Sequence, residues 1–216
     1  MESAMTETVL FDYWRSTASY RVRIALNLAG ITYQSKSVDL TTGAHRQPDH
    51  LARNPQGFVP VLEIDGLRLT QSLAILDYLD NTRDMGLLPI SPGERAKIMA
   101  LTHAIAVDIH PVCNLQVASY AAEITNDQKG IREQWMQRFI RPGLVAFESL
   151  LRDYNQNPFC CGDTPGLADI CLIPQLYNAH RWGVDISDLS RIKSVETACT
   201  TVPAFADAHP DAVNAT

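Results

Sequence analysis

The sequence predicts an α/β domain followed by an all-helical domain. Residues 9–82 alternate between short apolar runs typical of strands and periodic segments typical of helices, whereas the sequence after residue 93 has helical periodicity throughout. A linker composition separates the two parts, with Gly86, Pro89, Pro92 and Gly93 within residues 83–93. The chain of 216 residues is long enough for two small domains.

The first part begins with a strand, a helix and a second strand. Apolar residues predict a strand near 8–13, and apolar side chains at helical spacing then predict a helix near 17–29, with Gly30 as its stop signal. A second strand is expected near 32–38. Residues 41–57 are polar and rich in glycine and proline, which predicts a loop or short helical turns.

A hairpin and a helix complete the first part. Asp65-Gly66 stands between the apolar runs 59–64 and 67–69, a strong hairpin signal. Ser72 is then expected to cap an apolar helix.

The second part is predicted to be helical throughout. Apolar residues at helical spacing predict helices over 94–122, 131–154 and 167–182, and a last helix near 187–200. Pro142 and Pro174 lie inside two of these segments and predict a kink or a break there.

Composition excludes several classes of partner. The net charge of −6 argues against nucleic acid, and no apolar run is long enough to span a membrane. The polar, acidic residues 1–8 do not resemble a signal peptide, so we expect a cytoplasmic protein. The five cysteines include no C-x-x-C pair and read as free thiols, and no histidine has metal-ligand spacing, so no metal is expected.

Hydroxyl residues lie where the first strand turns into the first helix, in the segment Trp14-Arg15-Ser16-Thr17-Ala18-Ser19. Backbone N–H groups at a helix N-terminus, with hydroxyls beside them, favour an anion. The position alone leaves open whether that anion is a phosphate, a carboxylate or a thiolate.

Two further positions suggest ligand contacts. The bond before Pro60 is either an ordinary strand-opening X-Pro bond or a cis bond that lets Val59 offer its backbone groups to an extended peptide. Gln71 and Ser72, at a strand-to-helix junction, form either a carboxylate site or a simple N-cap.

Together these segments resemble zeta-class glutathione S-transferases, the class of the maleylacetoacetate isomerases. The resemblance covers about residues 8–210 and is carried by motifs in both halves of the chain. These are residues 16–26, 54–60 and 71–72, Asp108-Ile109-His110-Pro111 with Asn114-Leu115, Gly162-Asp163-Thr164-Pro165 with Leu167-Ala168-Asp169, Pro174-Gln175 and residues 181–185.

The resemblance implies a glutathione S-transferase fold and a homodimer. Residues 1–7 would be a disordered tail, 8–84 a thioredoxin-like α/β N-terminal domain that binds glutathione, 85–93 a linker and 94–216 an all-α C-terminal domain that binds substrate. Ser16 would stabilise the glutathione thiolate. The other implied glutathione contacts are Thr17, Ala18, Ser19, His45, Val59, Pro60, Gln71, Ser72, His110 and Asn114.

The implied reaction is the cis–trans isomerisation of maleylacetoacetate to fumarylacetoacetate in tyrosine and phenylalanine catabolism. A free thiol with a pKa near 8.5 is only about 3% ionised at pH 7, so a thiolate-stabilising group is needed. The substrate is a dicarboxylate keto acid, and Arg15 and Arg181 are the cations implied to bind it. Otherwise Arg15 is a surface residue beside Trp14, and Arg181 is a cation at a helix C-terminus.

The sequence departs from the class at several positions. Ala18 and Thr17 stand in a motif that commonly reads S-S-C, His45 stands where Gln is more frequent, and Gly166 stands where Ser or Thr usually caps a helix. The departures leave open a maleylpyruvate isomerase, a glutathione transferase acting on small haloacids, or a non-catalytic glutathione-binding module. Leu115 and Gln116, in place of the arginines typical of maleylpyruvate isomerases, favour maleylacetoacetate.

Overall fold

The computed structural model describes residues 7–125 and 130–214, so most of the expected N-terminal tail lies outside the described residues. Its contacts divide the chain into two compact units. One comprises Met1–Met85 together with Val202–Thr216, and the other is Gly86–Thr201. The expected helical domain over 94–216 thus differs from the contact-based division in its last segment, which groups with the first unit.

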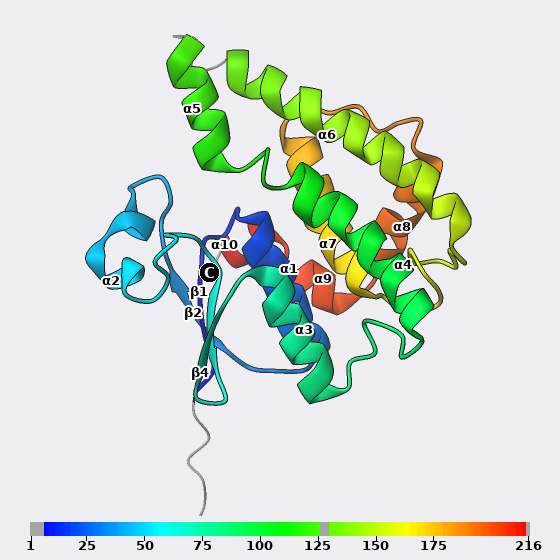
Figure 1. Cartoon of the computed structure of the whole chain (residues 1–216), viewed down its shortest axis with the longest axis horizontal. Coiled ribbons are helices and arrows are strands. Elements are labelled where there is room, and N and C mark those ends of the chain that lie inside the picture. Colours follow the sequence, from blue (N-terminus) through cyan, green and yellow to red (C-terminus); the bar gives the residue numbers. More distant parts are fainter. Residues whose placement is uncertain (1–6, 126–129, 215–216) are drawn as a thin grey trace, which may run out of the picture. The chain divides into compact units, whose positions relative to one another are not determined.

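The first unit is built on a mixed sheet (Figure 1). Among the described residues it has four strands, in the order β2-β1-β3-β4. These strands are β1 (Val9–Asp12), β2 (Gln34–Ser37), β3 (Val61–Ile64) and β4 (Leu67–Thr70). β1 runs parallel to β2 and antiparallel to β3, the thioredoxin-like arrangement that the resemblance implied.

The hairpin prediction is confirmed. Ile64 pairs with Leu67 across the turn, and Asp65 and Gly66 both have positive φ, 52° and 77°. Two successive positive φ angles define the turn type whose twist matches that of the flanking strands. A glycine at the second position takes this conformation without steric cost.

Helices α1 (Thr17–Leu28) and α3 (Ser72–Arg83) pack against each other on one side of the sheet (Figure 1). On the other face, Val9, Phe11, Tyr13, Val38, Val59 and Val61 form a buried cluster, partly covered by Leu40 and Ala44. The polar segment between β2 and β3 forms short turns, η1 (Ala44–Arg46) and α2 (Pro48–Leu51), as predicted.

The C-terminal segment of the chain packs on α1. It contains α9 (Pro203–Asp207) and α10 (Pro210–Asn214), neither of which the sequence patterns predicted. The Asn27 side chain of α1 donates to the Ala204 carbonyl at 3.1 Å, and the Tyr20 hydroxyl donates to the Phe205 carbonyl at 3.3 Å. These bonds explain why the segment groups with the first unit.

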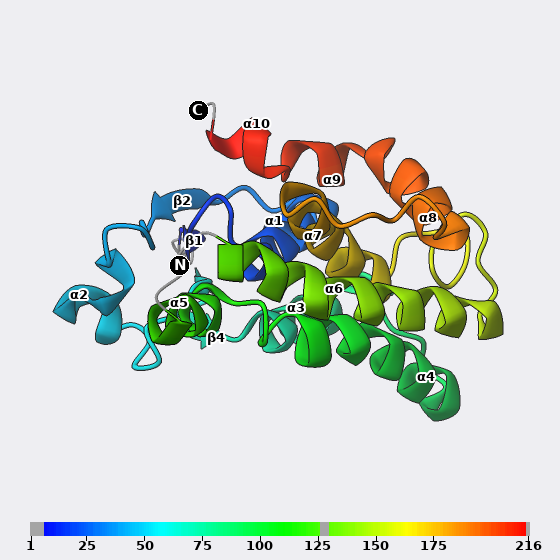
Figure 2. The same ribbon diagram turned by 90° about the horizontal axis from the view of Figure 1, so that it is seen from above.

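The second unit is helical (Figure 2). Its elements are α4 (Pro92–His103), η2 (Ala104–Ile109), α5 (Leu115–Thr125), α6 (Gly130–Leu150), η3 (Leu151–Asp153), α7 (Leu167–Arg181) and α8 (Ser190–Thr200). A single helix over 94–122 was expected, and this prediction is wrong. After α4 the backbone widens into a π-helical turn, in which the His110 N–H donates to the Ile105 carbonyl at 3.0 Å, and α5 then begins anew.

The two prolines inside predicted helices do not end them. Pro142 lies within α6 and Pro174 within α7, and both helices continue past them. Across residues 7–125 and 130–214, no helix has the length and apolar character needed to cross a membrane. The same residues include no group of three or more His, Cys, Asp or Glu side chains placed to hold a metal ion.

Candidate functional site

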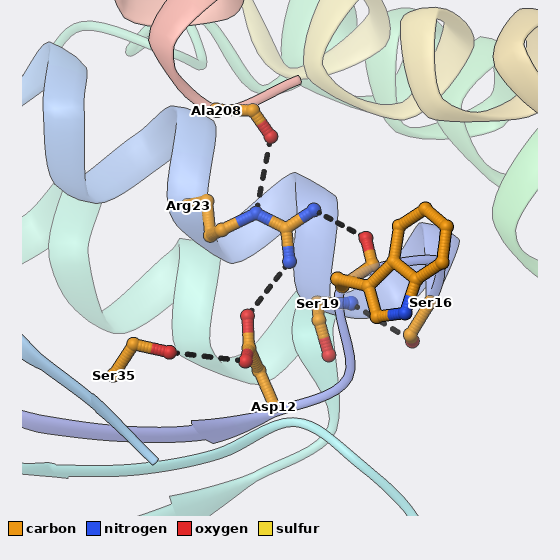
Figure 3. Close-up of polar contacts among 7 residues, drawn as sticks. Asp12, Ser16, Ser19, Arg23, Ser35 and Ala208 are labelled. Atoms are coloured by element: carbon orange, nitrogen blue, oxygen red, sulfur yellow. Dashed lines mark hydrogen bonds and ion pairs between the residues drawn. The ribbon is translucent and has the colours of Figure 1, made fainter. Parts of the chain in front are cut away.

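Ser16 caps the N-terminus of α1. Its backbone is extended, with φ −69° and ψ 118°, and its Oγ accepts the Ser19 N–H at 3.2 Å (Figure 3). Ser16 is partly exposed. A hydroxyl oxygen that accepts a hydrogen bond still carries its own proton, so the capping bond leaves this O–H able to donate to an anion.

The other residues of this turn differ in exposure. Thr17 and Ala18 are each 8% exposed, and Ser19 is fully buried. The Ser19 side chain is therefore not accessible to a ligand, and Ser19 contacts Ser16 through its backbone N–H.

Arg15 lies at the edge of the same turn. Its guanidinium stacks 4.5 Å from the centre of the Trp14 ring, and its Nη2 donates to the Tyr13 hydroxyl at 2.9 Å. Stacking on an aromatic ring holds a guanidinium in place and leaves its edge available to a carboxylate.

The loop before β3 is held by two buried side chains. The Val59–Pro60 peptide bond is cis, the second of the two geometries the sequence left open. The preceding Phe58 carbonyl accepts hydrogen bonds from His50 Nε2 and Asn54 Nδ2, both at 3.0 Å. Both donors are 3% exposed, so they fix the backbone that leads into Val59.

Gln71 and Ser72 begin α3. Gln71 has φ 67° and ψ 110°, and its side chain donates to Gln56 Oε1 at 2.8 Å. The expectation that Ser72 caps this helix is wrong by one residue. Gln71 occupies the N-cap position, because Ser72 already has helical geometry.

A buried cation lies behind Ser72. Arg21 of α1 is 1% exposed, and its Nη1 donates to Ser72 Oγ at 3.2 Å. The positive charge and the helix N-terminus both favour an anion at this position, and the Ser72 hydroxyl keeps a proton to donate to it. This geometry supports the carboxylate interpretation of Gln71-Ser72.

The surroundings of His45 favour its neutral form. Burial lowers its pKa from the ordinary value of 6.5, and the neighbouring charges of Arg46 and His50 lower it further. Its buried Nδ1 has no hydrogen-bond partner among the described residues. Because the lowered pKa favours the neutral imidazole, a hydrogen bond suits His45 better than an ion pair at neutral pH.

Three of the predicted residues belong to the second unit. His110 follows the π-helical turn, a feature that often marks functional positions. The Asn114 Oδ1 accepts the Val117 N–H at 2.9 Å and so caps α5. Arg181, the last residue of α7, is exposed, and its guanidinium lies 5.0 Å from the centre of the Trp182 ring.

No cysteine belongs to the unit that contains Ser16, because all five fall within Gly86–Thr201. Burial raises the pKa of Cys113 and of Cys161 to about 12 each and raises the pKa of Cys160 and of Cys199 as well. These four thiols are un-ionised at neutral pH. With Ala18 in the motif, the first unit has no thiol of its own.

Three polar residues beside the candidate site were given no role from the sequence. Arg21 and Arg23 lie in the motif over residues 16–26 and Gln56 in the motif over residues 54–60, and none of them was assigned a contact. The signal that could have found the arginines is their position in the buried part of a helix, where an arginine needs polar partners.

Comparison with known proteins identifies the fold first. The model of the glutathione S-transferase N-terminal domain matches residues 7–81. A solved holo structure of a maleylpyruvate isomerase, a bacterial zeta-class glutathione S-transferase, superposes with a TM-score of 0.91 at 35% identity, covering 94% of this chain and 97% of that one.

Other relatives define the class. The maleylacetoacetate isomerase of Rhizobium meliloti is 56% identical over 206 residues, which cover 95% of this chain and 97% of that one. The structure of maleylacetoacetate isomerase from Anaeromyxobacter dehalogenans with bound glutathione has a TM-score of 0.84 at 38% identity, covering 95% of this chain and 96% of that one. The chain therefore belongs to the zeta class of the glutathione S-transferase family, together with the maleylacetoacetate isomerases.

Proposed function

We propose that this chain is a glutathione-dependent isomerase that converts maleylacetoacetate to fumarylacetoacetate. The observation that carries the proposal is the Ser16 hydroxyl, which caps α1, is partly exposed and keeps a proton to donate. The 56% identity to the Rhizobium meliloti maleylacetoacetate isomerase over nearly the whole chain supports the choice of substrate.

The first unit fits glutathione at three positions. Ser16 is suited to the sulfur of glutathione. The backbone of Val59 follows the Phe58 carbonyl, which two buried side chains hold in place, and is suited to the peptide backbone of glutathione. Ser72, backed by the buried Arg21, is suited to the γ-glutamyl carboxylate. We assign Thr17, Ala18, the Ser19 N–H, His45, Pro60 and Gln71 to the surroundings of the same ligand.

Ser16 has the central chemical role. When bound, glutathione supplies the thiolate that adds to the cis double bond and is released after rotation, so the reaction involves no net oxidation. Holding the thiol ionised at neutral pH requires lowering its pKa by about two units, or about 2.7 kcal/mol. A hydroxyl donor to a charged group and the N-terminus of α1 together supply stabilisation of that size.

Arginines are assigned to the substrate. We propose that Arg15 and Arg181 bind its carboxylates, because a guanidinium matches a carboxylate with paired hydrogen bonds. We also propose that His110 and Asn114 contact glutathione. In this assignment, the first unit binds glutathione and the second unit contributes to glutathione and substrate binding.

Maleylpyruvate is the second candidate substrate. The close superposition on a maleylpyruvate isomerase favours it, whereas Leu115 and Gln116 stand where arginines are typical of that activity. Glutathione transfer to small haloacids is a further alternative, and a non-catalytic binding role is less well supported, because Ser16 and both candidate substrate arginines are present. We also propose that the chain acts in the cytoplasm as a homodimer, and sedimentation analysis tests the dimer directly.

One assay separates the two isomerases. Turnover of maleylacetoacetate and of maleylpyruvate is followed spectrophotometrically with purified protein and saturating glutathione. We expect a higher kcat/KM for maleylacetoacetate. A higher kcat/KM for maleylpyruvate would overturn the assignment and favour the second candidate.

A further inference from the structure

A buried arginine joins three parts of the first unit. Arg23 of α1 is 1% exposed, and its Nη1 contacts Asp12 Oδ2 at 2.7 Å. Its Nη2 donates to the Trp14 carbonyl at 2.9 Å, and its Nε donates to the Ala208 carbonyl at 3.1 Å. Figure 3 shows the guanidinium between these groups. The end of β1, the loop before α1 and the C-terminal segment thus meet at one planar side chain.

The contact with Trp14 lies within the turn that leads to Ser16. The Ser16 N–H donates to the Tyr13 carbonyl at 2.8 Å, so residues 13–16 form a single turn. The Trp14 carbonyl belongs to the central peptide of this turn. Fixing that peptide fixes the backbone that enters Ser16, and with it the direction of the Ser16 side chain.

Both members of the Arg23–Asp12 ion pair make further hydrogen bonds. Asp12 is 5% exposed, and its second carboxylate oxygen accepts the Ser35 hydroxyl of β2 at 3.2 Å. A buried ion pair is often no more stabilising than apolar residues of the same volume. Apolar residues could not donate to the Trp14 and Ala208 carbonyls, so the arrangement points to a geometric role in addition to stability.

We infer that Arg23 is a positioning residue for the Ser16 hydroxyl, with Asp12 and the Ala208 carbonyl as its anchors. The C-terminal segment thereby takes part in the glutathione site although it is remote from it in sequence. The inference rests on the proposed function, because it concerns how well Ser16 is aimed at the glutathione sulfur.

The test is Arg23→Lys. Lysine keeps a positive charge opposite Asp12, but a single ammonium lacks the rigid fork that reaches all three partners. We expect kcat for the isomerisation to fall by about tenfold to a hundredfold, as a small misplacement of a reacting group does. The thiolate absorbance of bound glutathione should fall in parallel. The KM for glutathione should stay within about threefold, because Val59 and Ser72 are untouched.

Asn27→Ala is the matched control. Asn27 lies on the same helix and donates to the same C-terminal segment, at the Ala204 carbonyl at 3.1 Å, and no hydrogen bond joins its side chain to residues 13–16 in the part of the chain that the structure describes. We expect a lower Tm with kcat within about twofold of the wild type. If Arg23 had only a structural role, Arg23→Lys would also lower the Tm and leave kcat within about twofold of the wild type.

Failure of the proposed function and failure of the positioning role give different results. Wild-type protein whose turnover does not require glutathione would refute the proposed function before any variant is measured. With the wild type active, a kcat for Arg23→Lys that equals the wild-type value, or a loss matched by Asn27→Ala, would refute the positioning role. Should Arg23→Lys not fold, Asp12→Asn removes one anchor instead. Reduced kcat at unchanged glutathione KM then supports the role, and unchanged kcat refutes it.

Discussion

Replacing Ser16 by alanine removes two interactions from one atom. Oγ accepts the Ser19 N–H at 3.2 Å, and loss of such an N-cap costs about 1 kcal/mol of stability. For a chain of this size, that loss lowers Tm by about 2–4 °C. The same substitution removes the O–H that we propose donates to the glutathione thiolate, and a hydrogen bond to a charged group contributes about 1.5–3 kcal/mol.

The loss of this hydrogen bond predicts a rise in the pKa of the thiol of bound glutathione. At 1.36 kcal/mol per unit, the thiol of bound glutathione should titrate about one to two units higher in Ser16→Ala than in the wild type. With the wild-type thiol at a pKa of about 6.5, the fraction of thiolate at pH 7 should then fall from about 0.8 to between about 0.24 and 0.03, and kcat should fall with it by about three- to twenty-five-fold. The pKa is measured from the ultraviolet absorbance of the thiolate in the complex, and kcat from the isomerisation.

A second variant separates the two effects. Glycine is nearly as good an N-cap as serine and costs only a few tenths of a kcal/mol, but it has no hydroxyl. Ser16→Gly and Ser16→Ala should therefore share the same raised thiol pKa, whereas only the alanine variant should lose appreciable Tm. The reasoning is refuted if either variant keeps the wild-type thiolate fraction and kcat.

Further substitutions test the supporting residues. Arg21→Met removes the buried cation behind Ser72, so the KM for glutathione should rise by about tenfold while kcat changes less, and an unchanged KM would contradict the carboxylate assignment. Burial lowers the pKa of His45, so the unfolded chain binds more protons than the folded chain just below the ordinary pKa of about 6.5. The free energy of unfolding should therefore fall as the pH drops through this range, and His45→Gln should flatten that slope in urea titrations. Gly166→Ser restores a hydroxyl at the N-cap of α7, where an added Cβ meets only the Leu87 carbonyl at 3.4 Å and an Asp169 oxygen at 3.9 Å, so Tm should rise slightly, by about 1–2 °C. A Tm that falls would show that the added side chain does not fit.

Local signals in the sequence were sufficient to predict most of the strands and helices of the first unit. The Asp65-Gly66 turn, the strand–helix alternation and the hydroxyl run before α1 all depend on neighbouring residues, and each has its predicted place. The break between α4 and α5 was missed, although Pro111 and Asn114, which caps α5, are sequence signals for the end of one helix and the start of the next.

Contacts between distant residues could not be predicted from periodicity. Arg23 reaches Ala208 across 185 positions, and Arg21 reaches Ser72 across 51 positions. A helix pattern shows that both arginines lie in a periodic segment, but their partners depend on tertiary packing. For the same reason the C-terminal segment was assigned to the helical domain, although its carbonyls accept hydrogen bonds from α1.

The central claim is most directly tested by measuring maleylacetoacetate turnover with and without glutathione, while the free thiol concentration is followed in the same reaction. We expect fumarylacetoacetate to form only when glutathione is present, with the thiol concentration unchanged at completion. Turnover without glutathione, or consumption of the thiol in proportion to product, would contradict a glutathione-dependent isomerase.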